Sequence, residues 1–132
     1  TGNLTLAGTL TVKDLTLTNN LTIGGHIITA GNTPTITPQA AAGQGATATI
    51  EGNDTSGVIV ISTGDSPISG DLVKINFSNA FGKLPKIVAT PQDGTTAMIQ
   101  PYATPELASF TLGAAAKLDQ NKTYVFSYFV IE

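Results

Sequence analysis

Five polar side chains able to hold a ligand fall in two short segments of the chain, residues 91–96 and 100–106. They are Gln92, Asp93, Gln100, Tyr102 and Glu106. Planar amides and carboxylates hydrogen-bond to sugars or peptides, and an aromatic ring stacks on them. Binding residues are found disproportionately on exposed loops of a rigid sheet. We therefore predict that these two segments form a ligand-binding surface.

Two of these residues also have a purely structural interpretation. Asp93 precedes Gly94, and this pair is typical of a tight hairpin turn. Tyr102 can equally anchor its loop by packing its ring against the predicted sheet. The sequence leaves both alternatives open.

The residues that catalysis usually needs are scarce. The chain has one histidine, His26, and no cysteine, so a single chain holds neither a Cys-His pair nor a self-sufficient zinc site. Asp54, Asp65 and Asp71 lie among turn residues, whose conformation their side chains stabilise. The glycines lack the following Lys-Ser/Thr of a phosphate-binding loop. We predict no enzymatic activity and no cofactor.

His26 acquires a second interpretation if the chain forms a trimer. Three imidazoles around a threefold axis can bind a transition metal. The simpler interpretation is a turn residue that follows Gly24 and Gly25. No metal is predicted for one chain, and His26 is a candidate ligand only on such an axis.

The composition excludes two classes of partner. Charged residues make up 11% of the 132 residues, none is Arg, and the formal net charge is -3. Binding to nucleic acid requires clustered Lys or Arg, and no apolar run approaches the ~20 residues that cross a bilayer. The 21 Thr, 14 Gly and 7 Pro favour strands and turns over helices. We expect an all-β protein that neither binds nucleic acid nor inserts into a membrane.

An internal repeat occupies residues 1–30. Its four copies are the triplets Leu4-Thr5-Leu6, Leu10-Thr11-Val12, Leu15-Thr16-Leu17 and Leu21-Thr22-Ile23. Side chains alternate along a strand, so both apolar residues of a triplet face one side and Thr faces the other. Gly, Asn and Asp between the triplets favour turns. The segment is predicted to be a short repetitive β-shaft, solenoid-like or intertwined with other chains.

This shaft is too short to bury a core by itself, because repeat architectures need about three or more units. We expect the missing apolar surface to come from more shaft before Thr1, from identical chains wound into a homotrimer, or from both. An ordinary β-meander is the alternative.

The composition changes over residues 31–45, where Pro and Gly among small polar residues predict a linker or neck. Residues 46–132 are predicted to form an antiparallel β-sandwich head domain, because turn-forming clusters separate seven strand-like runs. These runs cover residues 46–51, 58–63, 72–77, 86–90, 97–100, 109–112 and 123–131.

The last predicted strand is apolar on both faces. One face carries Tyr124, Phe126, Tyr128 and Val130, and the other carries Val125, Ser127, Phe129 and Ile131. A strand that is apolar on both sides is covered on both sides, and in so small a domain another subunit is one source of the second cover. Loops of the same domain are the alternative.

A pattern of core residues in the head supports a comparison with a known family. The pattern is Val73-x-Ile75-x-Phe77-x-x-x-Phe81-x-x-x-Pro85-x-Ile87, followed by the aromatic last strand. It resembles the H-type lectin fold and the similar head domains that end phage tail fibres, as does the layout of a repeat followed by a head. H-type lectins tend to carry Trp near the last strands and this chain has none, so no sugar-contacting residue is transferred. The resemblance implies a trimeric or hexameric assembly on a virion or extracellular surface, attached to a glycan or another receptor.

Two functions follow from these observations. In the first, the chain is a receptor-binding or attachment domain of a homotrimeric fibre of viral type, which binds a cell-surface glycan or another host receptor. In the second, it is a purely structural fibre, spike or capsid-surface component, whose head caps the trimer and binds no ligand.

Overall fold

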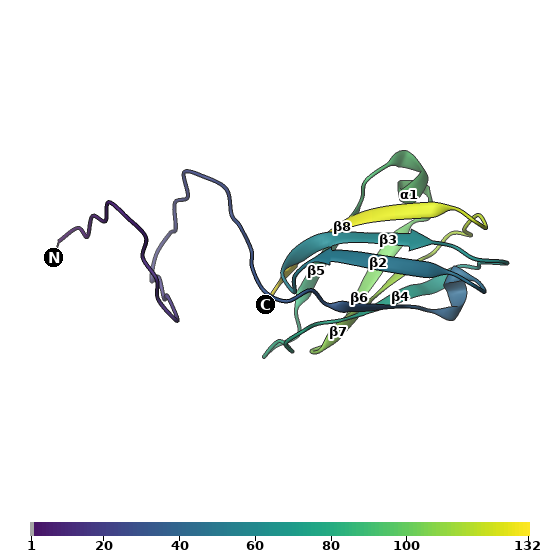
Figure 1. Cartoon of the computed structure of the whole chain (residues 1–132), viewed down its shortest axis with the longest axis horizontal. Helices are drawn as coiled ribbons and strands as arrows, with labels where there is room; N and C mark the ends of the chain where they lie inside the picture. The colour runs from purple at the N-terminus through teal and green to yellow at the C-terminus, as the bar shows by residue number, and fades with distance from the viewer. Residues whose placement is uncertain (1) are drawn as a thin grey trace.

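Short runs of alternating side chains form eight strands, which pair into two four-stranded antiparallel sheets (Figure 1). The computed structural model describes residues 2–132. The elements are β1 (Thr35–Pro38), η1 (Ala40–Ala42), β2 (Thr47–Gly52), β3 (Ser56–Ser62), β4 (Gly70–Asn76), β5 (Lys86–Pro91), α1 (Gly94–Met98), β6 (Pro101–Pro105), β7 (Ser109–Ala114) and β8 (Thr123–Ile131). The strand orders are β1-β4-β7-β6, here called the β7 sheet, and β2-β3-β8-β5, the β8 sheet. The all-β fold is thus confirmed, and the paired sheets are consistent with a β-sandwich.

The core lies between the two sheets. One face of β8 supplies Tyr124, Phe126, Tyr128 and Val130, each at most 3% exposed, whereas Phe129 and Ile131 on its other apolar face are 43% and 47% exposed. These side chains meet Val73, Ile75, Phe110 and Leu112 of the β7 sheet within one buried cluster. At ~25 cal/mol per Å² of buried apolar surface, such a cluster is the main source of stability in a chain without disulfides.

The aromatic residues of the lectin-like pattern pack at one end of this core. The rings of Phe77 and Phe81 meet edge to face, with centroids 4.8 Å apart. Phe77 also contacts Phe110, and Phe110 contacts Tyr128 in the opposite sheet. Edge-to-face pairs add about 0.5–1.5 kcal/mol beyond area burial. The pattern therefore reflects how the core is packed.

The prediction of a strand over residues 97–100 is wrong. That segment contains the end of α1 and a reversal at Gln100, whose φ is 53°. The helix forms because Asp93 caps it, and Ile99 then closes the core at 3% exposure. The strand follows instead as β6, bounded by Pro101 and Pro105. Pro lacks a donor N–H and is tolerated there because β6 is an edge strand.

Two elements lie within the segment predicted as a linker, residues 31–45. Strand β1 pairs with β4, and Ile36 packs against the core opposite Ile75. The 3-10 turn η1 then crosses to the second sheet, with Ala41 and Ala42 buried. The Pro residues on either side of Ile36 read as linker in the sequence, but edge strands accept Pro.

Residues 2–34 form no helix or strand and lead away from the sandwich (Figure 1). The chain bends at residues 7–8, 13, 18–19 and 24–25, which are the positions predicted to turn between triplets. The eight apolar side chains of the triplets are 46–82% exposed. A β-shaft and a trimer therefore stay predictions that concern several chains.

The described residues contain only the short helices η1 and α1, and none of them is long and apolar enough to cross a membrane.

Candidate functional site

The loops of the head gather at two opposite ends, because neighbouring strands in both sheets are antiparallel. At the junction, where residues 29–34 enter, Thr29 Oγ1 and Ser56 Oγ are 2.7 Å apart. Strand β3 runs from Ser56 to the opposite end, a length of about 20 Å at 3.3 Å per residue. We call this opposite end the distal end. Its loops are residues 39–46, 63–69, 92–100 and 115–122.

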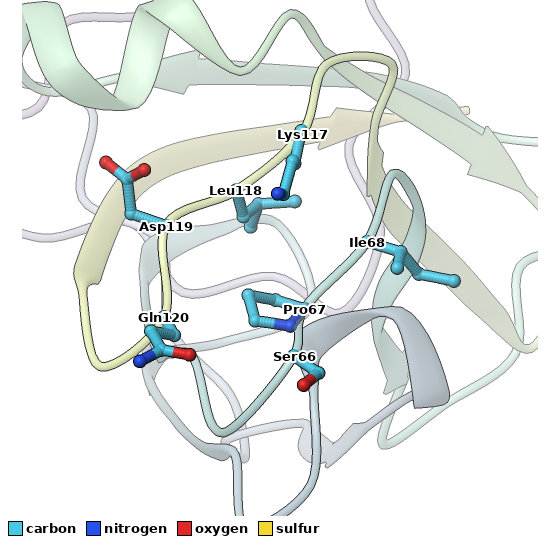
Figure 2. A pocket seen from close by; sticks show the side chains of 7 residues that line it. All are labelled: Ser66, Pro67, Ile68, Lys117, Leu118, Asp119 and Gln120. Atoms are coloured by element: carbon cyan, nitrogen blue, oxygen red, sulfur yellow. The ribbon is translucent and has the colours of Figure 1, made fainter.

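A depression of about 440 Å³ lies at the distal end (Figure 2). One wall belongs to the β3–β4 loop and the other to the β7–β8 loop. The lining residues are Ser66, Pro67, Ile68, Lys117, Leu118, Asp119 and Gln120. The depression therefore lies at the end of the head remote from the repeat.

The β7–β8 wall is fixed by two buried hydroxyl groups. Thr63 Oγ1 donates to the Asp119 carbonyl at 2.7 Å and accepts from Lys122 N–H at 2.9 Å. Tyr124 Oη accepts from the Asp119 N–H at 3.0 Å. Thr63 and Tyr124 are 4% and 1% exposed. Because these hydrogen bonds already order the β7–β8 loop, the loop loses little conformational entropy when a ligand binds.

The β3–β4 wall is held by backbone hydrogen bonds to the segment around η1. Ile68 N–H donates to the Ala41 carbonyl at 3.0 Å, and Asp65 exchanges two bonds with Gln44 at 2.8 and 3.0 Å. Ser66, between them, has φ 53°. A residue other than Gly rarely adopts this left-handed conformation, and such residues concentrate at functional sites.

The lining combines an apolar base with a polar rim. Pro67 and Leu118 are buried, and Figure 2 shows the Pro67 ring on the side of the β3–β4 loop that faces the β7–β8 loop. Lys117, Asp119 and Gln120 on the rim are exposed. Together they offer an ammonium group, a carboxylate and an amide, which can donate to and accept from a hydroxyl-rich ligand, and the exposed Ile68 adds an apolar surface. No His or Cys lines the depression beside Ser66, so no neighbouring group there would activate its hydroxyl as a nucleophile.

The structure brings three of the five predicted binding residues to the distal end, outside the lining of the depression. Gln92 Nε2 donates to Ser127 Oγ at 2.9 Å on the outer face of the β8 sheet. Gln100 has an exposed side chain, and its carbonyl accepts from Ala115 N–H. Asp93 caps α1 instead of forming the hairpin turn considered above.

The Asp93 carboxylate is bonded within its own turn. Oδ1 accepts from the Thr96 N–H at 2.7 Å, and Oδ2 accepts from the Thr96 hydroxyl at 2.9 Å. These two bonds, the backbone one first, lower the pKa of Asp93. Thr96 is fully buried and its hydroxyl also accepts from Val125 N–H at 3.2 Å, so the cap ties α1 to β8.

Tyr102 lies on strand β6, not in a loop. Its ring crosses Gly113 on the outer face of the β7 sheet, and its hydroxyl donates to Asp71 Oδ1 at 3.0 Å. This hydrogen bond is the main reason why the pKa of Tyr102 is raised. The side chain is half-exposed and anchored on the sheet, close to the structural alternative considered from the sequence.

Glu106 lies at the junction end and is not brought together with the other four. Its carboxylate accepts from the Ser109 hydroxyl and pairs with Lys74 Nζ at 3.0 Å. The Ser109 bond and then Lys74 lower its pKa. Antiparallel pairing decides this position, since β6 runs from the distal end to the junction.

His26 is exposed in the repeat segment, beyond the junction. Within residues 2–132 the structure gathers no group of three or more His, Asp or Glu side chains able to hold a metal ion. A metal on a threefold axis stays a prediction about assembled chains.

None of the seven residues that line the depression is among those predicted from the sequence. In the sequence they fall in the segments Asp65-Ser66-Pro67-Ile68 and Lys117-Leu118-Asp119-Gln120. Both segments have the composition of ordinary loops between strands, so neither indicates a binding site. The two loops are far apart in the sequence and meet because β3, which leads into the first loop, pairs with β8, which follows the second.

Comparison with protein-family models, with curated proteins and with solved structures finds no match for this chain.

Proposed function

We propose that this chain is the receptor-binding part of a homotrimeric fibre on a virion or another extracellular surface. One observation carries the proposal: the apolar repeat leaves the head at one end, and the depression lies at the other. If the repeats of several chains associate, each depression faces away from the shaft.

The repeat supports the assembly part of the proposal. Ten large apolar side chains between residues 4 and 28 are exposed, and no other part of residues 2–132 covers them. Exposed apolar surface of this extent marks an interaction site in a stable protein. Identical chains are the partner that supplies the same short apolar edges at the same spacing.

The depression supports the binding part. It has fixed walls, an apolar base and a mixed polar rim, which suit a sugar or another hydroxyl-rich receptor group. Lys117 and Asp119 carry opposite charges, so the lining favours neither strongly anionic nor strongly cationic ligands. Several copies on one fibre make weak sites useful through avidity.

The test is a glycan array probed with the intact chain, followed by titration of the best hit. We expect Lys117→Ala and Gln120→Ala to weaken binding about tenfold or more, because each removes hydrogen bonds to the ligand. Lys83, which is also exposed, lies between β4 and β5 near the junction, so Lys83→Ala is the matched control and should bind normally. Equal effects of Lys83→Ala and Lys117→Ala would reject the depression as the site.

A purely structural fibre or spike is the second candidate. It is favoured by the internal hydrogen bonds that occupy the side chains of Asp93, Tyr102 and Glu106. An oligomer that binds no glycan or cell surface would establish this alternative.

A further inference from the structure

We propose that the outer face of the β8 sheet is the surface by which heads of neighbouring copies of this chain pack together. The inference rests on the proposed assembly and adds to it a specific interface on the head. Its partner is a second copy of the chain.

The two outer faces of the sandwich differ in character. Across the centre of the β7 sheet the register aligns four polar side chains, one from each strand. They are Thr37, Lys74, Thr111 and Thr104. The β8 sheet instead points six apolar side chains outward from three of its four strands, β3, β8 and β5. They are Val58, Val60, Val88, Val125, Phe129 and Ile131.

The exposed part of this apolar set is concentrated on β5 and β8. Val88 lies directly opposite Phe129, and they are 57% and 43% exposed. Ile131, two residues further along β8, is 47% exposed. Direct cross-strand neighbours have Cβ atoms about 4.5–5.5 Å apart, so these side chains form one continuous patch. No described segment of the chain covers it.

The patch and the repeat meet at one corner of the head, which identifies the occupant. Ser56 is opposite Phe129 in the sheet register, and its hydroxyl lies 2.7 Å from Thr29 Oγ1. Thr29 also accepts from Asn53 Nδ2 at 3.0 Å, so two hydrogen bonds hold the start of the head beside this corner. In each chain the end of the repeat segment therefore lies close to Phe129. If the repeats of several chains associate, their Phe129 side chains are brought near one another.

The margins of the patch limit its size. Edge strand β2 points Thr47, Thr49 and Glu51 outward, and edge strand β5 contributes Lys86 and Thr90. An apolar centre with a polar rim is typical of protein interfaces. The polar β7 sheet and the distal depression then stay open to solvent in the assembly.

The chain has no cysteine, so single-cysteine variants report on the interface directly. Thr90→Cys labels the outer face of the β8 sheet, and Thr104→Cys is the matched control on the β7 sheet. Both positions are exposed threonines on edge strands. We would attach nitroxide labels to the full chain, confirm its mass by light scattering, and measure distances between chains by pulsed electron paramagnetic resonance.

We expect a narrow distribution at Thr90→Cys that lies at shorter distances than the distribution at Thr104→Cys. Adding Phe129→Asp to the Thr90→Cys variant should broaden its distance distribution. It should also raise the protein concentration at which half of the oligomer dissociates about tenfold, because a charge then enters the apolar patch. Thr104→Asp should change neither measurement. Circular dichroism of each variant confirms that the head is folded.

The other outcomes overturn the inference in distinguishable ways. Broad, similar distributions at both positions in a trimer would mean that the repeat alone joins the chains, which leaves the proposed function intact. Shorter distances at Thr104→Cys would place the interface on the β7 sheet. A monomeric mass without dipolar coupling at either position would reject both the interface and the proposed assembly.

Discussion

The Tyr128 hydroxyl donates a 2.6 Å hydrogen bond to the Asn53 backbone carbonyl, and this bond joins the core to the junction. Tyr128 is 3% exposed and Asn53 is 6% exposed. The Asn53 side chain in turn accepts from the Thr55 and Ser56 N–H groups and donates to Thr29. One buried phenol thus fixes the β2–β3 turn, to which Thr29 is hydrogen-bonded where the chain enters the head.

Tyr128→Phe should destabilise the head by about 1–3 kcal/mol, the cost of a buried acceptor left without its donor. Urea unfolding followed by circular dichroism measures the loss. Tyr102→Phe is the control, because its hydroxyl is bonded at the exposed surface, and its free energy of unfolding should change by less. A Tyr128→Phe variant as stable as the parent would mean that water replaces the missing donor.

The same phenol predicts a pH dependence. Burial, and then the negative charge of Asp54, raise the pKa of Tyr128 to about 12, from an ordinary value near 10. Because the folded pKa lies above the unfolded one, this contribution to stability is complete below about pH 10 and is lost as the pH rises towards 12. Urea unfolding of the parent chain and of Tyr128→Phe at pH 8 and pH 11 should therefore converge at the higher pH.

The lowered pKa of Asp93 predicts that the head becomes less stable at acidic pH. Hydrogen bonds from the Thr96 N–H and hydroxyl depress the pKa of Asp93, so its contribution is complete above its unfolded pKa and is lost as the pH falls through the lower folded value. Asp93→Ala should lower the Tm at pH 7, whereas Asp93→Asn retains an acceptor and should lower it less. The difference between parent and Asp93→Asn should shrink below pH 4. Equal melting temperatures for all three proteins at pH 7 would contradict the capping role.

Gly113 and Tyr102 predict a steric effect. A Cβ atom at Gly113 would lie 2.3 Å from the Tyr102 ring, so Gly113→Ala must displace the ring and its hydrogen bond to Asp71. We expect a loss of about 1–3 kcal/mol, as for other forced repacking. Gly94→Ala is the control, since nothing lies within 4 Å of the added atom. It should be neutral or slightly stabilising, as measured by thermal unfolding.

The repeat predicts a contrast between neighbouring residues. If chains associate through the apolar sides of the triplets, Leu15→Asp should dissociate the oligomer while Thr16→Asp leaves its mass unchanged, because the two side chains face opposite ways along a strand. Light scattering coupled to gel filtration reads both masses. Equal effects of the two substitutions would contradict the period-two pattern.

The sequence by itself determined the strand-rich class and most strand positions of the head. Alternation in residues 123–131 predicted a strand with two apolar faces, but only the tertiary structure decided that Tyr124 and Phe126 are buried while Phe129 is exposed. The prediction of strands from the sequence failed where the local residue pattern did not match the position that the segment takes in the sheet. Pro101 and Pro105 concealed β6, and the apolar run that ends at Ile99 resembled a strand, since whether Pro is tolerated depends on being at an edge.

Tertiary structure alone decided the site. Gln92, Asp93 and Glu106 are close in sequence, yet the direction of β6 places Glu106 at the junction and the other two at the distal end. Ser66 and Lys117 are far apart in sequence, yet they line one depression because β3 pairs with β8. The order and direction of the strands depend on how the apolar faces of all strands pack against one another. No local pattern of residues encodes this packing.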